Sequence, residues 1–115
     1  MKRLRLILTP SDPAGIYQLA FMPEALEEWR RLDNSIKELL RKALKKRLIQ
    51  PRVPGSELYG DLRTCYKIKL RKQGYRLVYT IEDDRLVVLV LAIDKREDMA
   101  AYQSALVRFS QQNRD

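Results

Sequence analysis

Positively charged side chains alternate along one short segment of this 115-residue chain and return in the next one. Lys67 and Lys69 lie two residues apart in the segment 64–70, and Arg76 lies in the segment 75–81. A spacing of two residues places side chains on the same face of a β-strand. Cations that converge on one face bind a phosphate through charge-assisted hydrogen bonds, and Arg can do so with two parallel bonds. These residues therefore indicate a surface that can bind a phosphate group.

Two absences narrow that chemistry. The chain has no histidine and a single cysteine, Cys65. Nucleophile systems that depend on histidine are excluded, as are His-ligated metals and cages of cysteine ligands. Any acid–base step must use Lys, Arg, Tyr, Asp or Glu. We therefore expect no metal site and no cofactor, and we interpret Cys65 as a small strand residue.

The apolar residues between the cations predict how the two segments pair. Tyr66, Ile68 and Leu70 alternate in the first segment, and Tyr75, Leu77, Tyr79 and Ile81 alternate in the second. Joining the apolar faces in an antiparallel hairpin pairs 70 with 75, 68 with 77 and 66 with 79. Lys69 then lies opposite Arg76, a like-charge pair that costs up to about 1 kcal/mol. Either a bound phosphate relieves this repulsion, or the long side chains extend into solvent.

The other elements follow from periodicity and turn signals. Strands are predicted at 16–21 and 86–93, helices at 24–32 and from 36 to Pro51, and a C-terminal helix that ends near Phe109. Asp94 with Glu97 three residues later predicts the cap of that last helix. We expect an α+β fold: an N-terminal strand, a helix hairpin, a three-stranded antiparallel meander that completes a four-stranded sheet, and the C-terminal helix. Residues 1–15 are predicted to be an extension, 16–109 a single domain and 110–115 a polar tail.

The positive charge is concentrated in one stretch. Residues 37–76 hold 13 Lys or Arg and only three Asp or Glu, whereas the whole chain has a net charge of +8. Lys37, Arg41 and Lys45 recur every four residues and predict a basic ridge along a helix. Such a surface either binds a polyanion or simply keeps the protein soluble. No stretch is long enough to cross a bilayer, so we expect no membrane partner and a cytoplasmic protein.

Two further residues bear on the candidate site. Arg96 lies at the junction of the last strand and the C-terminal helix, from which it could reach the polar face of the sheet. Tyr102 lies on the mostly apolar stripe of that helix, and this pattern alone indicates a core tyrosine with its hydroxyl at the edge.

Several segments resemble RelE-type toxins of bacterial type II toxin–antitoxin systems, within the RelE/ParE superfamily. The resemblance is carried by 65–71 (CYKIKLR) and 74–79 (GYRLVY), and by 25–29, 95–97 and 101–102 in the same order. It covers about residues 17–109. It implies a microbial-ribonuclease-like α+β fold and a ribosome-dependent endoribonuclease, or mRNA interferase, that cleaves translated messenger RNA.

The resemblance also assigns roles to individual residues, and it replaces the core interpretation of Tyr102. The catalytic set that it implies is Lys67, Lys69, Arg76, Arg96 and Tyr102. Other cations are expected to contact RNA or the ribosome, namely Lys37, Arg41, Lys45, Arg71 and Lys72. The implied partners are messenger RNA in the ribosomal A site, ribosomal RNA, and a cognate RelB-type antitoxin that wraps the toxin and displaces part of its C-terminal helix.

The chain departs from the family pattern at three places. Residues 1–15 are longer than the usual start, the tail after Phe109 is extended, and Tyr59 stands where a basic residue is often found. Three alternative functions also remain open. They are a ParE-like inhibitor of DNA gyrase, an RNA-binding module without catalysis, and an inactive relic of a toxin. The gyrase inhibitor would need neither the cationic face nor Tyr102.

Overall fold

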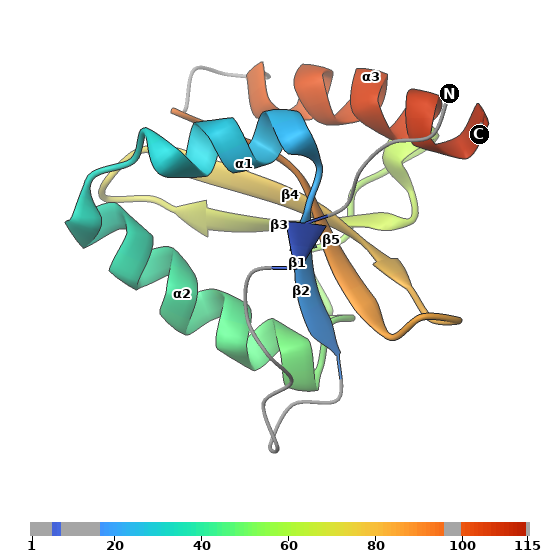
Figure 1. Cartoon of the computed structure of the whole chain (residues 1–115), viewed down its shortest axis with the longest axis horizontal. Coiled ribbons are helices and arrows are strands. Elements are labelled where there is room, and N and C mark those ends of the chain that lie inside the picture. The colour runs from blue at the N-terminus through green and yellow to red at the C-terminus, as the bar shows by residue number, and fades with distance from the viewer. Residues whose placement is uncertain (1–5, 8–16, 96–99, 115) are drawn as a thin grey trace.

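The computed structural model describes residues 6–7, 17–95 and 100–114, in which helices pack around one mixed sheet (Figure 1). The strands are β1 (Leu6–Ile7), β2 (Gln18–Phe21), β3 (Cys65–Leu70), β4 (Tyr75–Glu82) and β5 (Val87–Lys95). The helices are α1 (Pro23–Arg30), α2 (Asn34–Ile49) and α3 (Ala100–Arg114), with a short 3₁₀ turn at Gly60–Leu62. The α+β fold with a helix hairpin, an antiparallel meander and a C-terminal helix is confirmed.

The sheet has the order β1-β2-β5-β4-β3. The meander β3–β4–β5 is antiparallel, whereas β2 runs parallel to β5. The four expected strands are extended by β1, two residues that pair antiparallel with β2, so the sheet has five strands. The rest of the expected extension 1–15 lies outside the described residues.

Strand β5 is the centre of the sheet, because seven consecutive residues from Val87 to Ile93 are buried. Burial on both faces explains its nearly continuous apolar sequence. The register against β4 shifts between Val78 and Tyr79, which leaves Leu91 as the extra residue of a bulge. Strand β5 continues through Lys95, so the expectation that Asp94 caps α3 is wrong.

Helix α3 is longer than the periodicity suggests. It runs from Ala100 to Arg114, so the polar tail expected at 110–115 is helical through residue 114. Polar residues extend a helix at low cost where nothing competes for their backbone, and apolar periodicity cannot mark such an end.

The helix hairpin buries the apolar stripe that its sequence predicts. Pro23 begins α1 at the position where the missing N–H costs nothing. Trp29 packs edge-on against Phe21, with ring centroids 5.5 Å apart, and so joins α1 to the sheet. In α2 the buried residues recur every four positions and form one face of the helix. They are Ile36, Leu40, Leu44 and Leu48.

Helices α2 and α3 cover opposite faces of the sheet. Tyr79 receives a hydrogen bond from Arg47 of α2, whereas Arg76 lies against Tyr102 of α3. Residues 76 and 79 are three positions apart on one strand, so their side chains point to opposite faces. Cys65 is buried within the sheet, and burial raises the pKa of its thiol to about 11, as expected of an unreactive strand residue. Across the described ranges, no helix is long and apolar enough to span a membrane.

The loop before β3 covers the outer edge of that strand. The Lys67 N–H donates to the Ser56 carbonyl at 2.9 Å, and the Leu58 N–H donates to the Cys65 carbonyl at 3.0 Å. From the end of α2, Arg47 donates to the carbonyl of Lys67 at 3.3 Å. The backbone that carries Lys67 is therefore held by a loop on one side and by α2 from beneath.

Candidate active site

The cations of the first hairpin converge on the face of the sheet that α3 covers. The register pairs Lys69 with Arg76 and Lys67 with Val78, and this confirms the pairing predicted from the apolar alternation. Residues directly opposite each other share a face, and Lys67 lies two positions from Lys69 on the same strand. Lys69 is exposed, and Lys67 and Arg76 are half-buried. Three positive side chains thus surround one area of the sheet surface.

Helix α3 adds Tyr102 to this group. The guanidinium carbon of Arg76 lies 5.9 Å from the centroid of the Tyr102 ring, a cation–π contact. Tyr102 is half-buried and also packs against the edge of the core. The apolar stripe thus located the ring of Tyr102 but did not indicate its contact with Arg76.

The crowding of cations perturbs Lys69. The pKa of its ammonium group is lowered from the ordinary value of 10.5, first by loss of hydration and then by nearby positive charge. Those charges belong to Lys67, Arg76 and Arg71. A bound phosphate would reverse this effect, because a negative charge favours the protonated amine.

A cavity of about 310 Å³ opens at the turn of this hairpin. It is lined by Lys69, Leu70, Arg71, Gly74, Tyr75 and Arg76. Three of these residues are cationic and none is acidic, so the cavity favours an anion. Its volume is at the lower end of the range for small-ligand sites. Gly74 adopts a φ of 75° at the turn, a backbone conformation that glycine adopts without strain.

Asp94 is a neighbour of the site that the sequence did not reveal. In the pairing of β4 with β5 it lies opposite Arg76, so Arg76 stands between Lys69 on one side and Asp94 on the other. A carboxylate beside Arg76 offsets part of the repulsion from Lys69. The sequence did not indicate that β5 extends to Lys95, because the aspartate before the expected helix has the pattern of a helix cap.

The remaining site candidates are distributed differently. Arg96 lies outside the described residues. Arg71 and Lys72 are exposed in the turn between β3 and β4, next to the cationic face. Lys37, Arg41 and Lys45 lie on α2, on the opposite side of the sheet from that face.

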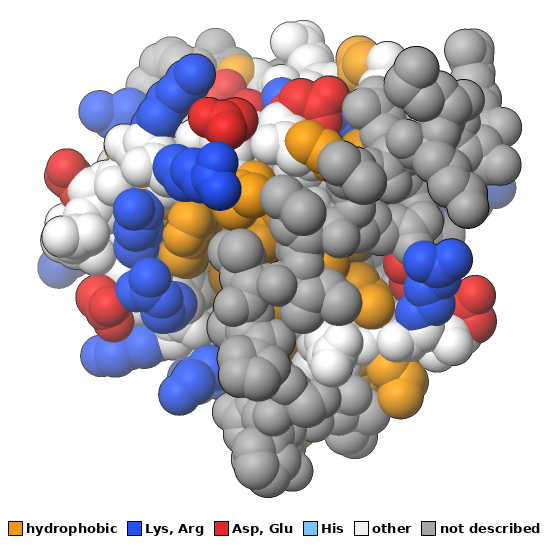
Figure 2. Space-filling view, in the orientation of Figure 1, with side chains coloured by type: hydrophobic (Ala, Val, Ile, Leu, Met, Phe, Trp, Pro, Cys, Tyr) orange, Lys and Arg blue, Asp and Glu red, His pale blue; other side chains and the backbone are white. Residues whose placement is uncertain are grey.

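The basic ridge of α2 nevertheless lies largely at the surface. Arg41 and Lys45 are exposed and Lys37 is half-buried. Figure 2 shows basic side chains gathered along the left of the view, over α2. Arg41 also lies over the Trp29 ring at 5.5 Å and bonds Glu38 at 2.6 Å, so part of its charge is used within the helix hairpin.

A metal centre finds no support in the described part of the chain. No group of three or more Cys, Asp or Glu side chains among those residues is arranged to hold an ion. The side chains that the described residues bring together at the site are those of Lys67, Lys69, Arg76 and Tyr102.

Comparison with known proteins identifies the family of the chain. Residues 19–100 match the family model described as the ParE toxin of type II toxin–antitoxin systems, parDE. The mRNA interferase toxin RelE of Escherichia coli strain K12 is 45% identical over 92 residues, 80% of this chain and 96% of that protein. The mRNA interferase RelE of Shigella flexneri matches with the same identity and coverage.

Solved structures lead to the same family. The crystal structure of the isolated E. coli RelE toxin has a TM-score of 0.68 at 43% identity and covers 81% of this chain and 98% of that one. The intact E. coli RelBE toxin–antitoxin complex matches with a TM-score of 0.67 at 45% identity, over 71% of this chain and 99% of that one. The cationic strand face, the helix that closes over it and these relatives together place the chain in the RelE/ParE family of toxins of type II toxin–antitoxin systems, as a RelE-type member.

Proposed function

We propose that this protein is a ribosome-dependent endoribonuclease that cleaves messenger RNA in the ribosomal A site. The observation that carries the proposal is the position of Arg76, between Lys69 on the neighbouring strand and the Tyr102 ring on α3. The site thus offers cations for a phosphate and a hydroxyl for proton transfer at one place. The curated relatives named mRNA interferases support the same reaction class.

The proposed reaction is an internal transfer at one phosphodiester. The 2′-oxygen of a nucleotide bonds to the adjacent phosphorus while the bond from phosphorus to the 5′-oxygen breaks. The products are a 2′,3′-cyclic phosphate and a 5′-hydroxyl. Tyr102 as its phenolate, or a neighbouring lysine as its free amine, accepts the 2′ proton. The leaving 5′-oxygen takes up a proton from water, and Arg96 stabilises its developing negative charge.

The cations act on the charge that develops during this transfer. Lys67, Lys69 and Arg76 stabilise the phosphoryl oxygens, and each such donor is worth about 10²–10³ in rate by analogy with oxyanion stabilisation. Tyrosine and lysine are poor bases at neutral pH. Substrate geometry must therefore contribute much of the acceleration, which fits a site that is completed only when the ribosome presents the messenger.

The test is cleavage of a messenger on purified ribosomes, with the 5′ ends of the fragments mapped. Arg76→Ala removes a phosphate donor and Tyr102→Phe removes only the hydroxyl while keeping the ring. We expect each to slow cleavage by about 10²–10³-fold. The controls are Arg85→Ala, in the exposed turn after β4, and Tyr59→Phe, whose side chain is 84% exposed. Both controls should cleave at the wild-type rate.

Full activity in both Arg76→Ala and Tyr102→Phe would rule out the proposed site. A parallel experiment measures DNA supercoiling by gyrase. It is included because the family model that matches is that of the ParE toxin, and a ParE-like gyrase inhibitor is the alternative function. Loss of supercoiling with intact messenger would replace the endoribonuclease by a gyrase inhibitor. Salt-sensitive ribosome binding without cut ends would indicate an RNA-binding module.

The proposal extends to the macromolecules that this protein meets. Ribosomal RNA contacts are assigned to Lys37, Arg41 and Lys45 on α2, and to Arg71 and Lys72 at the hairpin turn. The partner that controls the toxin is a RelB-type antitoxin. Support comes from two solved relatives, the intact RelBE complex at 45% identity and an E. coli RelE variant bound to an antitoxin RelB peptide at 43% identity.

A further inference from the structure

Helix α3 fully buries no large apolar side chain among residues 100–111. The buried residues there are Ala101 and Ala105, whereas Tyr102, Leu106 and Phe109 are half-buried and pack against the core. An alanine methyl removes far less apolar surface from water than a leucine or phenylalanine side chain does. Hydrophobic contact alone therefore fixes the position of α3 less firmly than that of α2, which buries four large aliphatic residues.

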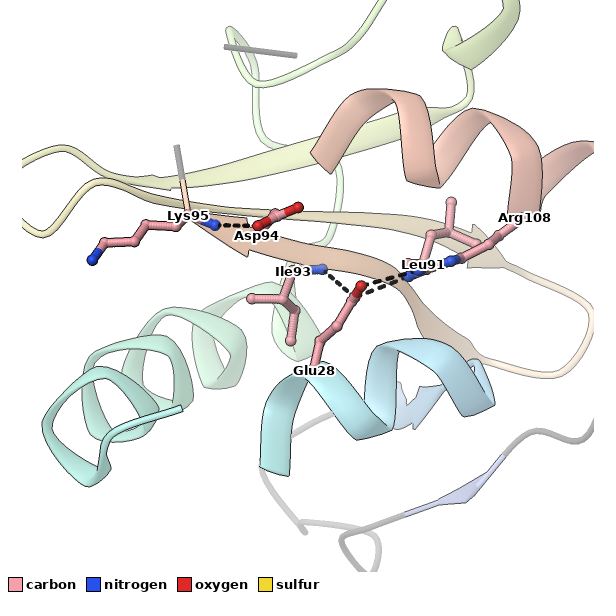
Figure 3. Close-up of polar contacts among 6 residues, drawn as sticks. All are labelled: Glu28, Leu91, Ile93, Asp94, Lys95 and Arg108. Atoms are coloured by element: carbon pink, nitrogen blue, oxygen red, sulfur yellow. Dashed lines mark hydrogen bonds and ion pairs between the residues drawn. The ribbon is translucent and has the colours of Figure 1, made fainter. Parts of the chain in front are cut away.

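A bidentate ion pair supplies a second attachment for α3. Arg108 of α3 meets Glu28 of α1, with Nη1–Oε1 at 2.9 Å and Nη2–Oε2 at 3.0 Å (Figure 3). The same Nη1 donates to the Leu91 carbonyl at 2.8 Å, and the Ile93 N–H donates to Glu28 Oε1 at 3.0 Å. We call these four residues the Glu28–Arg108 latch; it joins α1, β5 and α3.

The backbone groups of β5 after Val90 can bond the latch side chains because β2 ends there. Strand β2 ends at Phe21, opposite Val90, so β5 continues without a neighbouring strand on that side. The bulge at Leu91 turns the backbone locally at the same point. The carbonyl of Leu91 and the N–H of Ile93 therefore take side-chain partners in place of a strand.

The latch is partly withdrawn from water. The side chains of Arg108 and Glu28 are 15% and 24% exposed. In the same helix α1, the neighbouring Glu27 bonds Arg30 at 3.1 Å with side chains 59% and 62% exposed. Bidentate, partly desolvated pairs fix geometry, whereas exposed pairs contribute little. Glu27 thus offers a control that matches Glu28 in residue type and in helix.

The latch and the candidate site lie on one rigid element. Tyr102 precedes Arg108 by six residues, about 9 Å along the helix at 1.5 Å per residue. A shift of α3 at Arg108 therefore moves the Tyr102 ring relative to Arg76, which is fixed in the sheet. We propose that Glu28 and Arg108 are positioning residues that set Tyr102 against Arg76 for RNA cleavage; this inference rests on the proposed function.

The expected effect is on the rate of the chemical step. A misplacement of about 1 Å in a reacting group can cost about 10²-fold in rate. Glu28→Gln loses the charge of the pair but keeps an oxygen for the Ile93 N–H. We expect kcat on ribosomes to fall about 10- to 100-fold while KM stays within about 2-fold, because the latch contributes none of the cations assigned to RNA. Arg108→Lys keeps the charge without the fork and should retain an intermediate kcat.

The experiment compares Glu28→Gln, Arg108→Lys and Glu27→Gln with the wild type by two measurements. One is the kcat and KM of messenger cleavage on ribosomes, and the other is the NMR spectrum of ring-labelled tyrosine, in which Tyr102 is assigned with Tyr102→Phe. Thermal melts confirm that each variant is folded at the assay temperature. The inference predicts that the Tyr102 ring signal and kcat both change in Glu28→Gln, less in Arg108→Lys, and that neither changes in Glu27→Gln.

The outcomes separate the two proposals. A Tyr102 signal that is the same in Glu28→Gln as in Glu27→Gln overturns the positioning role, whatever the cleavage rate. A wild type that cleaves, with Glu28→Gln equal to it in kcat, also overturns the role. A shifted Tyr102 signal together with a wild type that leaves messenger intact supports the coupling of latch and tyrosine and overturns the proposed endoribonuclease.

Discussion

Lys69 and Arg76 stand directly opposite each other on neighbouring strands, with Lys67 on the same face. Like charges in this position weaken a sheet. The pKa of Lys69 is lowered first by loss of hydration and then by this repulsion. Asp94 on the third strand offsets part of it. The repulsion between these side chains lowers the stability of the protein without a ligand, and a bound phosphate would relieve it. Residues that serve function often reduce stability in this way.

Removing the repulsion between Lys69 and Arg76 should raise the free energy of unfolding but impair cleavage. Lys69→Glu turns the cross-strand repulsion into an ion pair with Arg76, so the free energy of unfolding should rise by up to about 1 kcal/mol. The same change puts a carboxylate beside the scissile phosphate, so cleavage should be lost. Urea unfolding and ribosome cleavage measure the two effects. Lys69→Gln, which only removes the repulsion, should show about half the gain, and a variant less stable than wild type would contradict this account.

At the scale of elements, α2 supports the cationic strand from beneath. Arg47 donates to the Tyr79 hydroxyl at 2.8 Å and also bonds the backbone of Lys67. Tyr79 is fully buried and donates to the Pro51 carbonyl at 2.6 Å. One arginine and one tyrosine thus connect the end of α2, the following loop and two strands, and they hold Lys67 from the side of the sheet opposite to its own side chain.

Removing the Tyr79 hydroxyl should loosen this support. Tyr79→Phe removes the hydroxyl that bonds the buried Pro51 carbonyl and the half-buried Arg47 guanidinium. The expected loss of unfolding free energy is about 1–3 kcal/mol. Burial raises the pKa of Tyr79 above its ordinary value of 10.0. The folded state therefore holds the proton more tightly than the unfolded chain, so the wild type loses this stability as pH rises above about 10.

The measurement is urea unfolding of wild type and Tyr79→Phe at pH 7 and at pH 10.5. Tyr79→Phe should be less stable at pH 7 and should lose less of its stability at the higher pH. Tyr59→Phe at the exposed loop tyrosine is the control and should match the wild type at both values. Equal pH dependence in wild type and Tyr79→Phe would show that the tyrosine is not held in this way.

The pairing of β3 with β4 could be predicted from the alternation of apolar residues along each strand. Alternation of Tyr66, Ile68 and Leu70 specified the hairpin register, because a slip of one residue would expose that whole face. The contacts between distant residues could not be predicted. Glu28 and Arg108 are 80 positions apart, and nothing in either sequence neighbourhood indicates the partner. Asp94 was misassigned because Asp94 with Glu97 three residues later has the spacing of a capping box, although β5 continues through Lys95.

For the molecule as a whole, the basic ridge of α2 and the cationic face lie on opposite sides of the sheet. Further exposed cations, Arg71 and Lys72, lie at the β3–β4 turn. The excess charge in residues 37–76 thus follows a surface path and is not one compact patch. The cationic face was predicted from strand register. Its separation from the basic ridge depends on which helix covers which face of the sheet, and no local sequence pattern indicates that.

This separation predicts that binding and cleavage can be changed independently. Replacing Lys37, Arg41 and Lys45 by Gln should lower the dependence of ribosome affinity on salt, by about 0.7–0.9 in logarithmic slope per cation and about 2.1–2.7 in all. The cleavage rate at saturating ribosome should stay near the wild-type rate. Filter binding across a potassium chloride series measures the slope, and Arg85→Gln is the control. An unchanged slope would remove the ridge from the interface.

The loop across the outer side of β3 has one further consequence. A strand with free amide and carbonyl groups recruits strands from other molecules, which leads to domain swapping and aggregation. Here residues 56–58 occupy those groups at Cys65 and Lys67 from within the same chain. A second copy therefore meets backbone groups of Cys65 and Lys67 that are already paired, and this part of the sheet margin is protected from self-association.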